Sequence, residues 1–121
     1  MKTQPKWNKK VEQDDFEAAE SYLSLIYSPK KSARFVAELR RARPAEFKAK
    51  DIFRASQLSK LGVSNLRVAG YRRKIKMGKP LSPILLVRDD SHGKVVVADG
   101  YHRLCAVYEV NEDTWIPCRI V

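Results

Sequence analysis

The sequence predicts a single α/β domain of the mixed α+β type, with a helical hairpin added at its N-terminus. Three observations predict it. Apolar residues recur at helical spacing early in the chain, a β-hairpin pattern appears after residue 82, and a strand then runs directly into a helix. The 121 residues suit one domain that can bury a core without disulfides or metal ions. We divide the chain into a flexible arm (1–13), a helical hairpin (14–45) and a C-terminal α/β unit (46–121).

The helical hairpin rests on two periodic segments. Apolar residues at helical spacing predict an amphipathic helix over 15–27, and Asp14 stands three residues before Glu17, as in a capping box. Ser28-Pro29 then offers an N-cap followed by proline at the first helical position. The second helix should end near Arg43, because a proline follows.

The middle of the chain has a weaker pattern. We predict a short edge strand over 49–53 and a turn over 58–63. Ser64 is the predicted cap of a third helix, and Gly78 is the expected left-handed residue that ends it.

The C-terminal part begins with two short apolar runs, 83–88 and 94–98, separated by turn-forming residues. This is the pattern of a β-hairpin. A helix over 102–108 and a last strand over 115–121 should follow. Pro117 suggests that this last strand is an edge or carries a bulge, because proline cannot donate to the ladder.

Positive charge dominates the middle of the chain. The net charge is +10, and residues 30–79 alone carry 16 Lys and Arg against three acidic residues, a net of +13. Such an excess attracts anionic partners, namely nucleic acid, nucleotides, an acidic protein or anionic lipid. The alternative, that basic helices only keep the protein in solution, stays open.

Several classes are not expected. No run of 18 apolar residues predicts a transmembrane helix, so no membrane partner is expected, and the N-terminus lacks the apolar stretch of a signal peptide. Cys105 and Cys118 form neither a CxxC pair nor a zinc pattern, so we expect reduced thiols and no protein-bound metal. These features predict a cytoplasmic protein.

The candidate site is the strand-to-helix turn Asp99-Gly100-Tyr101-His102-Arg103. A helix start presents free N–H groups and a partial positive charge, so His102 and Arg103 in its first turn oppose the dipole unless an anion compensates them. Arg103 can clamp phosphate oxygens, and His102 can donate to another oxygen or exchange a proton. Asp99 can cap the helix, contact a metal or accept a proton. The alternative is an ordinary Asp-Gly turn, with His102 bonded to a neighbouring carbonyl.

These residues also carry a resemblance. The segment VADGYHRLCA (97–106), followed by WIPCRIV (115–121), resembles the ParB/sulfiredoxin superfamily, and the similarity extends roughly over 47–121. It implies a small mixed sheet with packed helices, and a His-Arg turn that grips nucleotide phosphates. The implied cofactor is a nucleoside triphosphate or diphosphate (ATP, ADP or CTP), with Mg²⁺ left open. The pattern looks most like a group of short bacterial proteins of this superfamily.

Individual members of the superfamily match to different degrees. The catalytic cysteine of sulfiredoxins falls where this chain has Tyr101, which argues against that activity. A free-serine kinase of this fold has an aspartate before the glycine, as Asp99 is here. The resemblance further implies phosphate contacts from Lys50, Arg54 and Ser64; for the first two, a solvated strand edge is the alternative.

The function predicted from these features is binding of a nucleotide or another phosphate ligand. If the protein is an enzyme, it would be a small nucleotide-dependent phosphotransferase with Asp99 and His102 as catalytic residues. Two alternatives stay open: a nucleic-acid-binding accessory module that uses the basic 30–79 surface, and a protein-interaction domain whose pocket has decayed. The sequence leaves the oligomeric state open.

Overall fold

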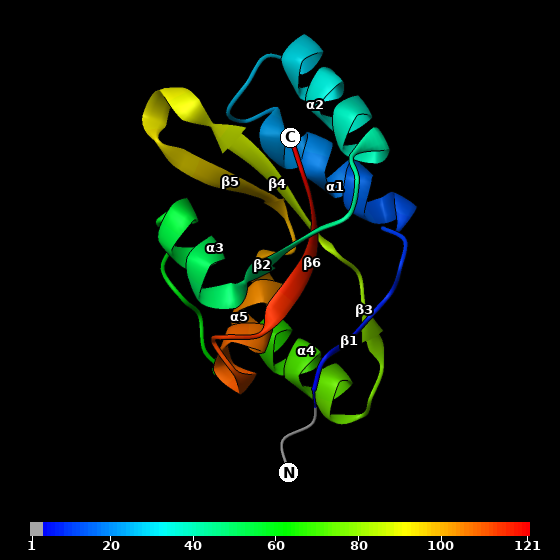
Figure 1. The fold of residues 1–121 in the computed structure, drawn as a ribbon, viewed down its shortest axis with the longest axis vertical. Coiled ribbons are helices and arrows are strands. Elements are labelled where there is room, and N and C mark those ends of the chain that lie inside the picture. The colour runs from blue at the N-terminus through cyan, green and yellow to red at the C-terminus, as the bar shows by residue number, and fades with distance from the viewer. Residues whose placement is uncertain (1–3) are drawn as a thin grey trace.

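The structure, a computed structural model that describes residues 4–121, is an α+β fold in which a four-stranded sheet lies between two groups of helices (Figure 1). In chain order the elements are β1 (Lys6–Trp7), α1 (Gln13–Leu23), α2 (Pro29–Arg41), β2 (Ala45–Lys48), α3 (Ala49–Ser56), α4 (Leu66–Lys76), β3 (Pro80–Leu81), β4 (Ile84–Asp89), a 3-10 turn (Asp90–His92), β5 (Lys94–Asp99), α5 (Tyr101–Val110) and β6 (Trp115–Ile120). The predicted fold class is therefore confirmed.

The main sheet is mixed, with strand order β2-β6-β4-β5. Strand β6 runs antiparallel to β2 and parallel to β4, while β4 and β5 form the predicted antiparallel hairpin. The hairpin turn contains the 3-10 turn and ends at Gly93, whose φ of 63° is left-handed. The sheet thus brings the C-terminal strand between two strands that precede it in the chain.

Both faces of β4 are buried, which explains its continuous apolar run. Ile84 and Leu86 pack into the cluster formed with α3, α4 and α5, whereas Leu85 and Val87 pack against α1 and α2. A strand covered on both faces needs apolar side chains at consecutive positions rather than at alternating ones.

The helical hairpin is part of this same body. Helices α1 and α2 bury Phe16, Leu23 and Leu39 against the face that β4 and β5 turn toward them. The predicted boundary between 45 and 46 falls inside β2. The hairpin therefore forms one of the two helical layers over the sheet.

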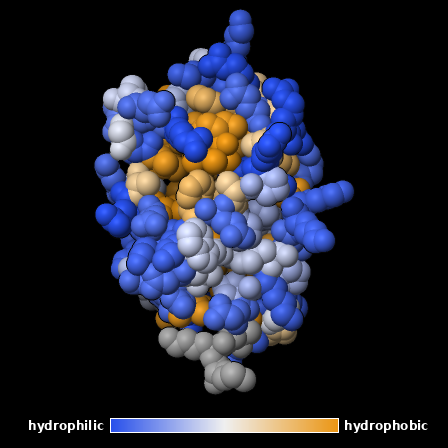
Figure 2. All heavy atoms as spheres, in the orientation of Figure 1, coloured by the Kyte–Doolittle hydropathy of each residue, from blue (hydrophilic) through white to orange (hydrophobic). Residues whose placement is uncertain are grey.

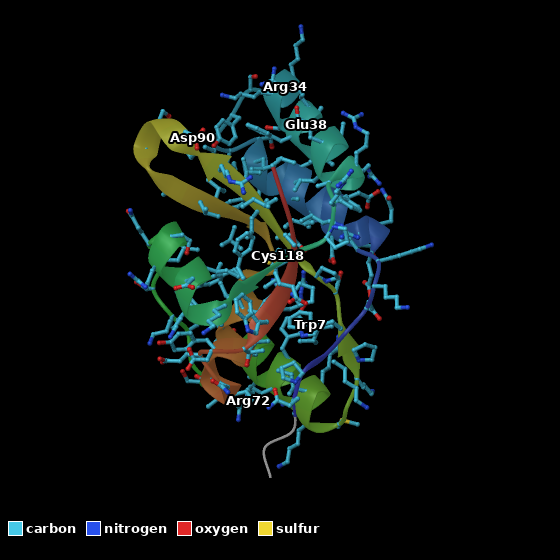
Figure 3. The ribbon with its side chains drawn as sticks, in the orientation of Figure 1. Trp7, Arg34, Glu38, Arg72, Asp90 and Cys118 are labelled. Carbon is cyan, nitrogen blue, oxygen red and sulfur yellow. The ribbon has the colours of Figure 1, made fainter. Side chains whose placement is uncertain are left out.

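The segment predicted as a flexible arm is tied to the fold in the part that the structure describes. Strand β1 pairs in parallel with β3, and the Asn8 amide donates to the Leu81 carbonyl at 2.8 Å. Trp7 is half-buried and packs against the core beside β3 (Figures 1 and 3). Residues 1–3 of the predicted arm lie outside the described residues.

The bounds of the first helix differ from the prediction. Helix α1 covers Gln13–Leu23 rather than 15–27, and its N-cap Glu12 makes no side-chain cap bond, so the capping box is not formed. After Leu23 the chain turns toward α2, and Leu25 and Ile26 are left exposed. Helix α2 begins as predicted, with Ser28 accepting from the Lys31 amide at 3.2 Å, and it ends at Arg41.

The strand predicted over 49–53 is wrong, because these residues form the first turns of helix α3. Its buried residues are Ala49, Ile52, Phe53 and Ser56, which recur at intervals of three and four. This spacing places them on one helical face against the core. The edge strand lies just before, at β2.

The predicted cap of the third helix is also wrong. Asn65, not Ser64, caps α4: its Oδ1 accepts from the amides of Arg67 at 3.0 Å and Val68 at 3.2 Å. Gly78 does follow this helix with a left-handed φ of 71°, as predicted.

Pro117 does not mark an edge strand, because β6 is an inner strand of the sheet. Its place explains why it is tolerated. The Val121 amide donates to the Leu86 carbonyl of β4. Along a strand, alternate backbone nitrogens face the same neighbouring strand, so the nitrogen of Pro117 also faces β4. The pairing with β4 begins only at Cys118, so no partner strand stands opposite the missing donor.

Among residues 4–121, no helix has the length and apolar character needed to cross a membrane.

Candidate functional site

A cleft of about 360 Å³ opens where α1, α4, α5 and the end of β5 meet. Its lining residues are Ala18, Tyr22, Leu58, Arg67, Tyr71, Val97, Ala98, Asp99, Gly100, Tyr101, His102 and Arg103. The complete predicted turn, 99–103, therefore forms one wall. The volume is at the lower end of small-molecule sites, which span about 300–1,000 Å³.

The start of α5 faces this cleft without a side-chain cap. Strand β5 ends at Asp99, and Gly100 takes the N-cap position with a φ of 102°. Glycine has no side chain that could accept from the first helical amides, so these donors have no partner within the helix. The positive end of the helix dipole thus points at the cleft.

Arg103 does not extend into the cleft as a free clamp. The residue is 6% exposed, and its Nη2 donates to Asp99 Oδ2 at 3.1 Å and to the Pro83 carbonyl at 3.1 Å. The same nitrogen lies 3.6 Å from Asp15 Oδ2. The guanidinium folds under the turn so closely that a Cβ on Gly100 would lie 2.9 Å from Nη2. Its charge is therefore compensated by carboxylates of the protein itself.

Asp15, which sequence reasoning missed, enters this cluster from α1. Its side chain is 14% exposed, that of Asp99 is 16% exposed, and one guanidinium serves both carboxylates. Burial raises the pKa of Asp99 to about 6; Arg103 opposes this shift, and the negative charge of Asp15 adds to it. The pKa of Arg103 is raised, because the two carboxylates outweigh the lowering effect of burial. Asp15 Oδ2 and Arg103 Nε are buried without a hydrogen-bond partner.

His102 lies half-buried on the cleft wall. Burial, followed by the charge of nearby Arg67, lowers its pKa below the ordinary 6.5, so the imidazole is neutral at pH 7. The crowding of two cations that the sequence predicted at this helix start is thus relieved by neutral His102 and paired Arg103. Neutral imidazole can still donate one hydrogen bond and accept another.

Arg67 and Tyr71 are two further cleft residues that the sequence did not reveal. Both lie on α4: Arg67 is exposed in the first turn, and Tyr71 has the Arg103 guanidinium 5.9 Å from its ring centre. Arg67 forms no ion pair with another residue of the described chain. It is therefore a cation at the cleft that the fold leaves available.

Three of the predicted phosphate contacts do not line the cleft. Lys50 Nζ lies 2.6 Å from Asp113 Oδ1, and that carboxylate raises its pKa. Arg54 pairs with Asp51 at 3.4 Å, and its side chain is 81% exposed. Ser64 is exposed in the turn before α4. The resemblance implies Lys50 and Arg54 as phosphate contacts; in the structure both lie on α3, and their ion-pair partners lie outside the cleft.

The basic 30–79 segment extends along the whole length of the molecule (Figure 1). Helix α2 lies at one end of the long axis and α4 at the other (Figure 1). Arg34 and Arg72, labelled in Figure 3, show this separation. The basic residues of α2 and α4 thus lie at opposite ends of the molecule, and those of β2 and α3 lie between them (Figure 1).

A second hollow is chemically different. Figure 2 shows an apolar depression over the sheet, where a groove of about 210 Å³ runs between α3 and the β4–β5 hairpin. Phe47, Ile52 and Ile120 are among its mainly apolar lining residues. It lacks the convergent polar groups of the cleft beside α5.

The cleft offers acceptors and donors rather than a complete metal-ligand set. Within residues 4–121, no three His, Cys, Asp or Glu side chains are grouped to hold a metal ion. Searched against known proteins, the chain matches no family model, no curated protein and no solved structure.

Proposed function

We propose that the cleft beside α5 binds the phosphate of a nucleotide, so that the chain is a phosphate-binding protein of the ParB/sulfiredoxin type. One observation carries the proposal: the uncapped start of α5 faces the cleft beside Arg67 and His102. Free amides at a helix start, together with an arginine, are a ready anion site.

The roles within the site differ from those that the sequence suggested. Arg67 and the amides of Tyr101 and His102 are the phosphate ligands in this proposal. His102 adds a hydrogen bond through its neutral ring, and Arg103 holds Asp99 in place. In this proposal the phosphate binds to the exposed Arg67, while the buried Arg103 fixes the position of Asp99 in the cleft wall.

The rest of the lining favours a nucleotide over a bare phosphate ion. Tyr22, Leu58 and Tyr71 form an apolar and aromatic part of the same cleft. A nucleoside has a flat face that packs on such side chains, and its phosphates can reach the charged end. ATP, ADP and CTP all fit this description.

The carboxylate of Asp99 supports phosphotransferase chemistry in the same cleft. In the reaction we propose, the hydroxyl oxygen of an acceptor forms the new bond to the terminal phosphorus, and its proton passes to Asp99. The bond between that phosphorus and the bridging oxygen breaks, and the nucleotide leaves with one phosphate fewer, as a diphosphate from ATP or CTP and as a monophosphate from ADP. A cytoplasmic location would supply such nucleotides.

Isothermal titration calorimetry tests the binding proposal. ATP, ADP, CTP and inorganic phosphate are each titrated into the protein with and without Mg²⁺. We expect at least one nucleotide to bind, and Arg67→Met to weaken it by roughly tenfold or more, the effect of losing a charged hydrogen bond. Absence of heat with every nucleotide would overturn the proposal.

Arg73→Met is the matched control for Arg67→Met. Arg73 lies on the same helix and is exposed, but it does not line the cleft. Its replacement removes the same charge from the molecule without touching the site. Equal losses from the two variants would mean that general electrostatic attraction, rather than the cleft, accounts for binding.

A further inference from the structure

Asp15 contacts the candidate site from α1, behind the residues that line the cleft. It does not line the cleft, and its Oδ2 is sealed inside the protein. Asp15 therefore acts on a bound ligand through its charge and through the groups that it contacts. The Arg103 guanidinium lies 3.6 Å from its Oδ2.

The charges around this guanidinium do not balance. Nη2 of Arg103 serves Asp99 at 3.1 Å and Asp15 at 3.6 Å, so one cation faces two carboxylates. Burying a carboxylate without full compensation is costly, and natural cores rarely keep such an arrangement. Of the two carboxylates, only Asp99 lines the cleft. A ligand can therefore compensate the negative charge of Asp99, but not that of Asp15, by direct contact.

Other groups at the cleft do not remove the imbalance. From α4, Tyr71 faces the Arg103 guanidinium, and Arg67 is exposed at the cleft. From α5, His102 is neutral at pH 7 because its pKa is lowered. The two carboxylates share one guanidinium, so a proton or a hydrogen-bond donor from the ligand would compensate the remaining negative charge.

We propose that Asp15 is a positioning residue: by sharing the Arg103 guanidinium, it leaves Asp99 under-compensated and ready to take a proton from a ligand in the cleft. The proposal rests on the proposed function in one respect, since the proton donor is the hydroxyl of the phosphate acceptor. It assigns a role in the site to α1, the helix that lies outside the region of resemblance.

A titration of Asp99 without any ligand tests this role. The carboxyl carbon of Asp99 is followed by ¹³C NMR against pH in the wild type, in Asp15→Asn and in Asp14→Asn. Removing the negative charge of Asp15 should lower the apparent pKa of Asp99 by roughly one unit, the effect of a neighbouring like charge. Asp14 is the adjacent, exposed residue of the same helix turn, and its replacement should leave that pKa in place.

Asp15→Glu changes the length of the side chain but keeps its negative charge. If the charge is what matters, the pKa of Asp99 should stay elevated in this variant. The proposal is overturned if Asp99 titrates alike in the wild type and in Asp15→Asn, or if Asp15→Glu lowers its pKa as Asp15→Asn does. Should Asp15→Asn not fold, Asp15→Ser removes the same charge, and the same comparison decides. Because no nucleotide is present, a failure here is distinct from a failure to bind nucleotides in calorimetry.

Discussion

Nη2 of Arg103 donates a hydrogen bond to Oδ2 of Asp99, four residues earlier in the chain, across 3.1 Å. This bond spans the turn between β5 and α5, and it orients the carboxylate at the wall of the cleft. Asp15 approaches the same nitrogen from α1. The candidate site is thus organised around the buried Arg103, and Arg67, the cation that we propose binds the ligand, comes from a different helix, α4.

Replacing Arg103 by methionine should destabilise the protein strongly. The change leaves Asp15 and Asp99 buried without their shared cation, and breaking a buried ion pair from one side typically costs about 3–5 kcal/mol. Urea unfolding at pH 7 measures the free energy of unfolding. At acidic pH, where Asp99 is protonated, the loss should be smaller.

Arg54→Met is the control for Arg103→Met. Arg54 pairs with Asp51 at the surface, where its side chain is 81% exposed, and such pairs contribute about 1 kcal/mol or less. If Arg103→Met lowers the free energy of unfolding no more than Arg54→Met does, Arg103 does not form a stabilising buried ion pair with Asp15 and Asp99.

The raised pKa of Asp99 predicts a specific pH dependence of stability. Between its ordinary pKa of 3.8 and the value of about 6 in the folded protein, the folded state binds more protons at this residue than the unfolded chain. The contribution of Asp99 to the free energy of unfolding is therefore fully present below pH 3.8, and it is lost as the pH rises through about 6. Asp99→Asn removes this dependence.

The measurement is the difference in unfolding free energy between Asp99→Asn and the wild type, taken at several pH values. That difference should shift in favour of the variant as the pH rises across the window. Asp113→Asn gives the opposite sign as a control, because the hydrogen bond from Lys50 lowers the Asp113 pKa. A flat difference for Asp99→Asn would mean that its carboxyl is fully compensated by Arg103.

The elements with a strong local signal could be predicted from the sequence. The β4–β5 hairpin has two apolar runs and a left-handed glycine, and α2 has a serine cap before proline. Helix α3 was missed because its eight residues contain only two large apolar side chains, Ile52 and Phe53, so periodicity is hard to count. The pairing of β1 with β3 depends on a contact between segments more than 70 residues apart, which local patterns do not encode.

The same division applies to the candidate site. The turn 99–103 lies in one stretch of sequence, and it does line the cleft. Asp15 and Arg67 come from helices far away in the chain, and only packing of α1 and α4 beside α5 brings them to the turn. Their one sequence signal is a charge on an otherwise ordinary amphipathic helix, which many surface residues share.

The cap of α4 provides a direct test of one corrected assignment. Asn65→Ala removes the acceptor for the amides of Arg67 and Val68, so it should lower the free energy of unfolding by about 0.5–2 kcal/mol. Ser64→Ala, one residue earlier, should change it by no more than about 0.5 kcal/mol, as exposed positions generally do. Chemical denaturation of both variants gives the comparison, and the reverse order would restore Ser64 as the cap.

Gly100→Ala should be among the most damaging small substitutions in the chain. Two penalties add at this position. A φ of 102° is strained for any residue with a Cβ, and that Cβ would lie 2.9 Å from both Arg103 Nη2 and Ile84 Cγ1. The backbone strain alone costs on the order of 1–3 kcal/mol. Gly93→Ala has a left-handed φ of 63° but meets nothing within 4 Å, so it isolates the backbone part. Thermal unfolding of the pair should therefore show the larger loss at Gly100, and equal losses would mean that Arg103 can move away from the turn without cost.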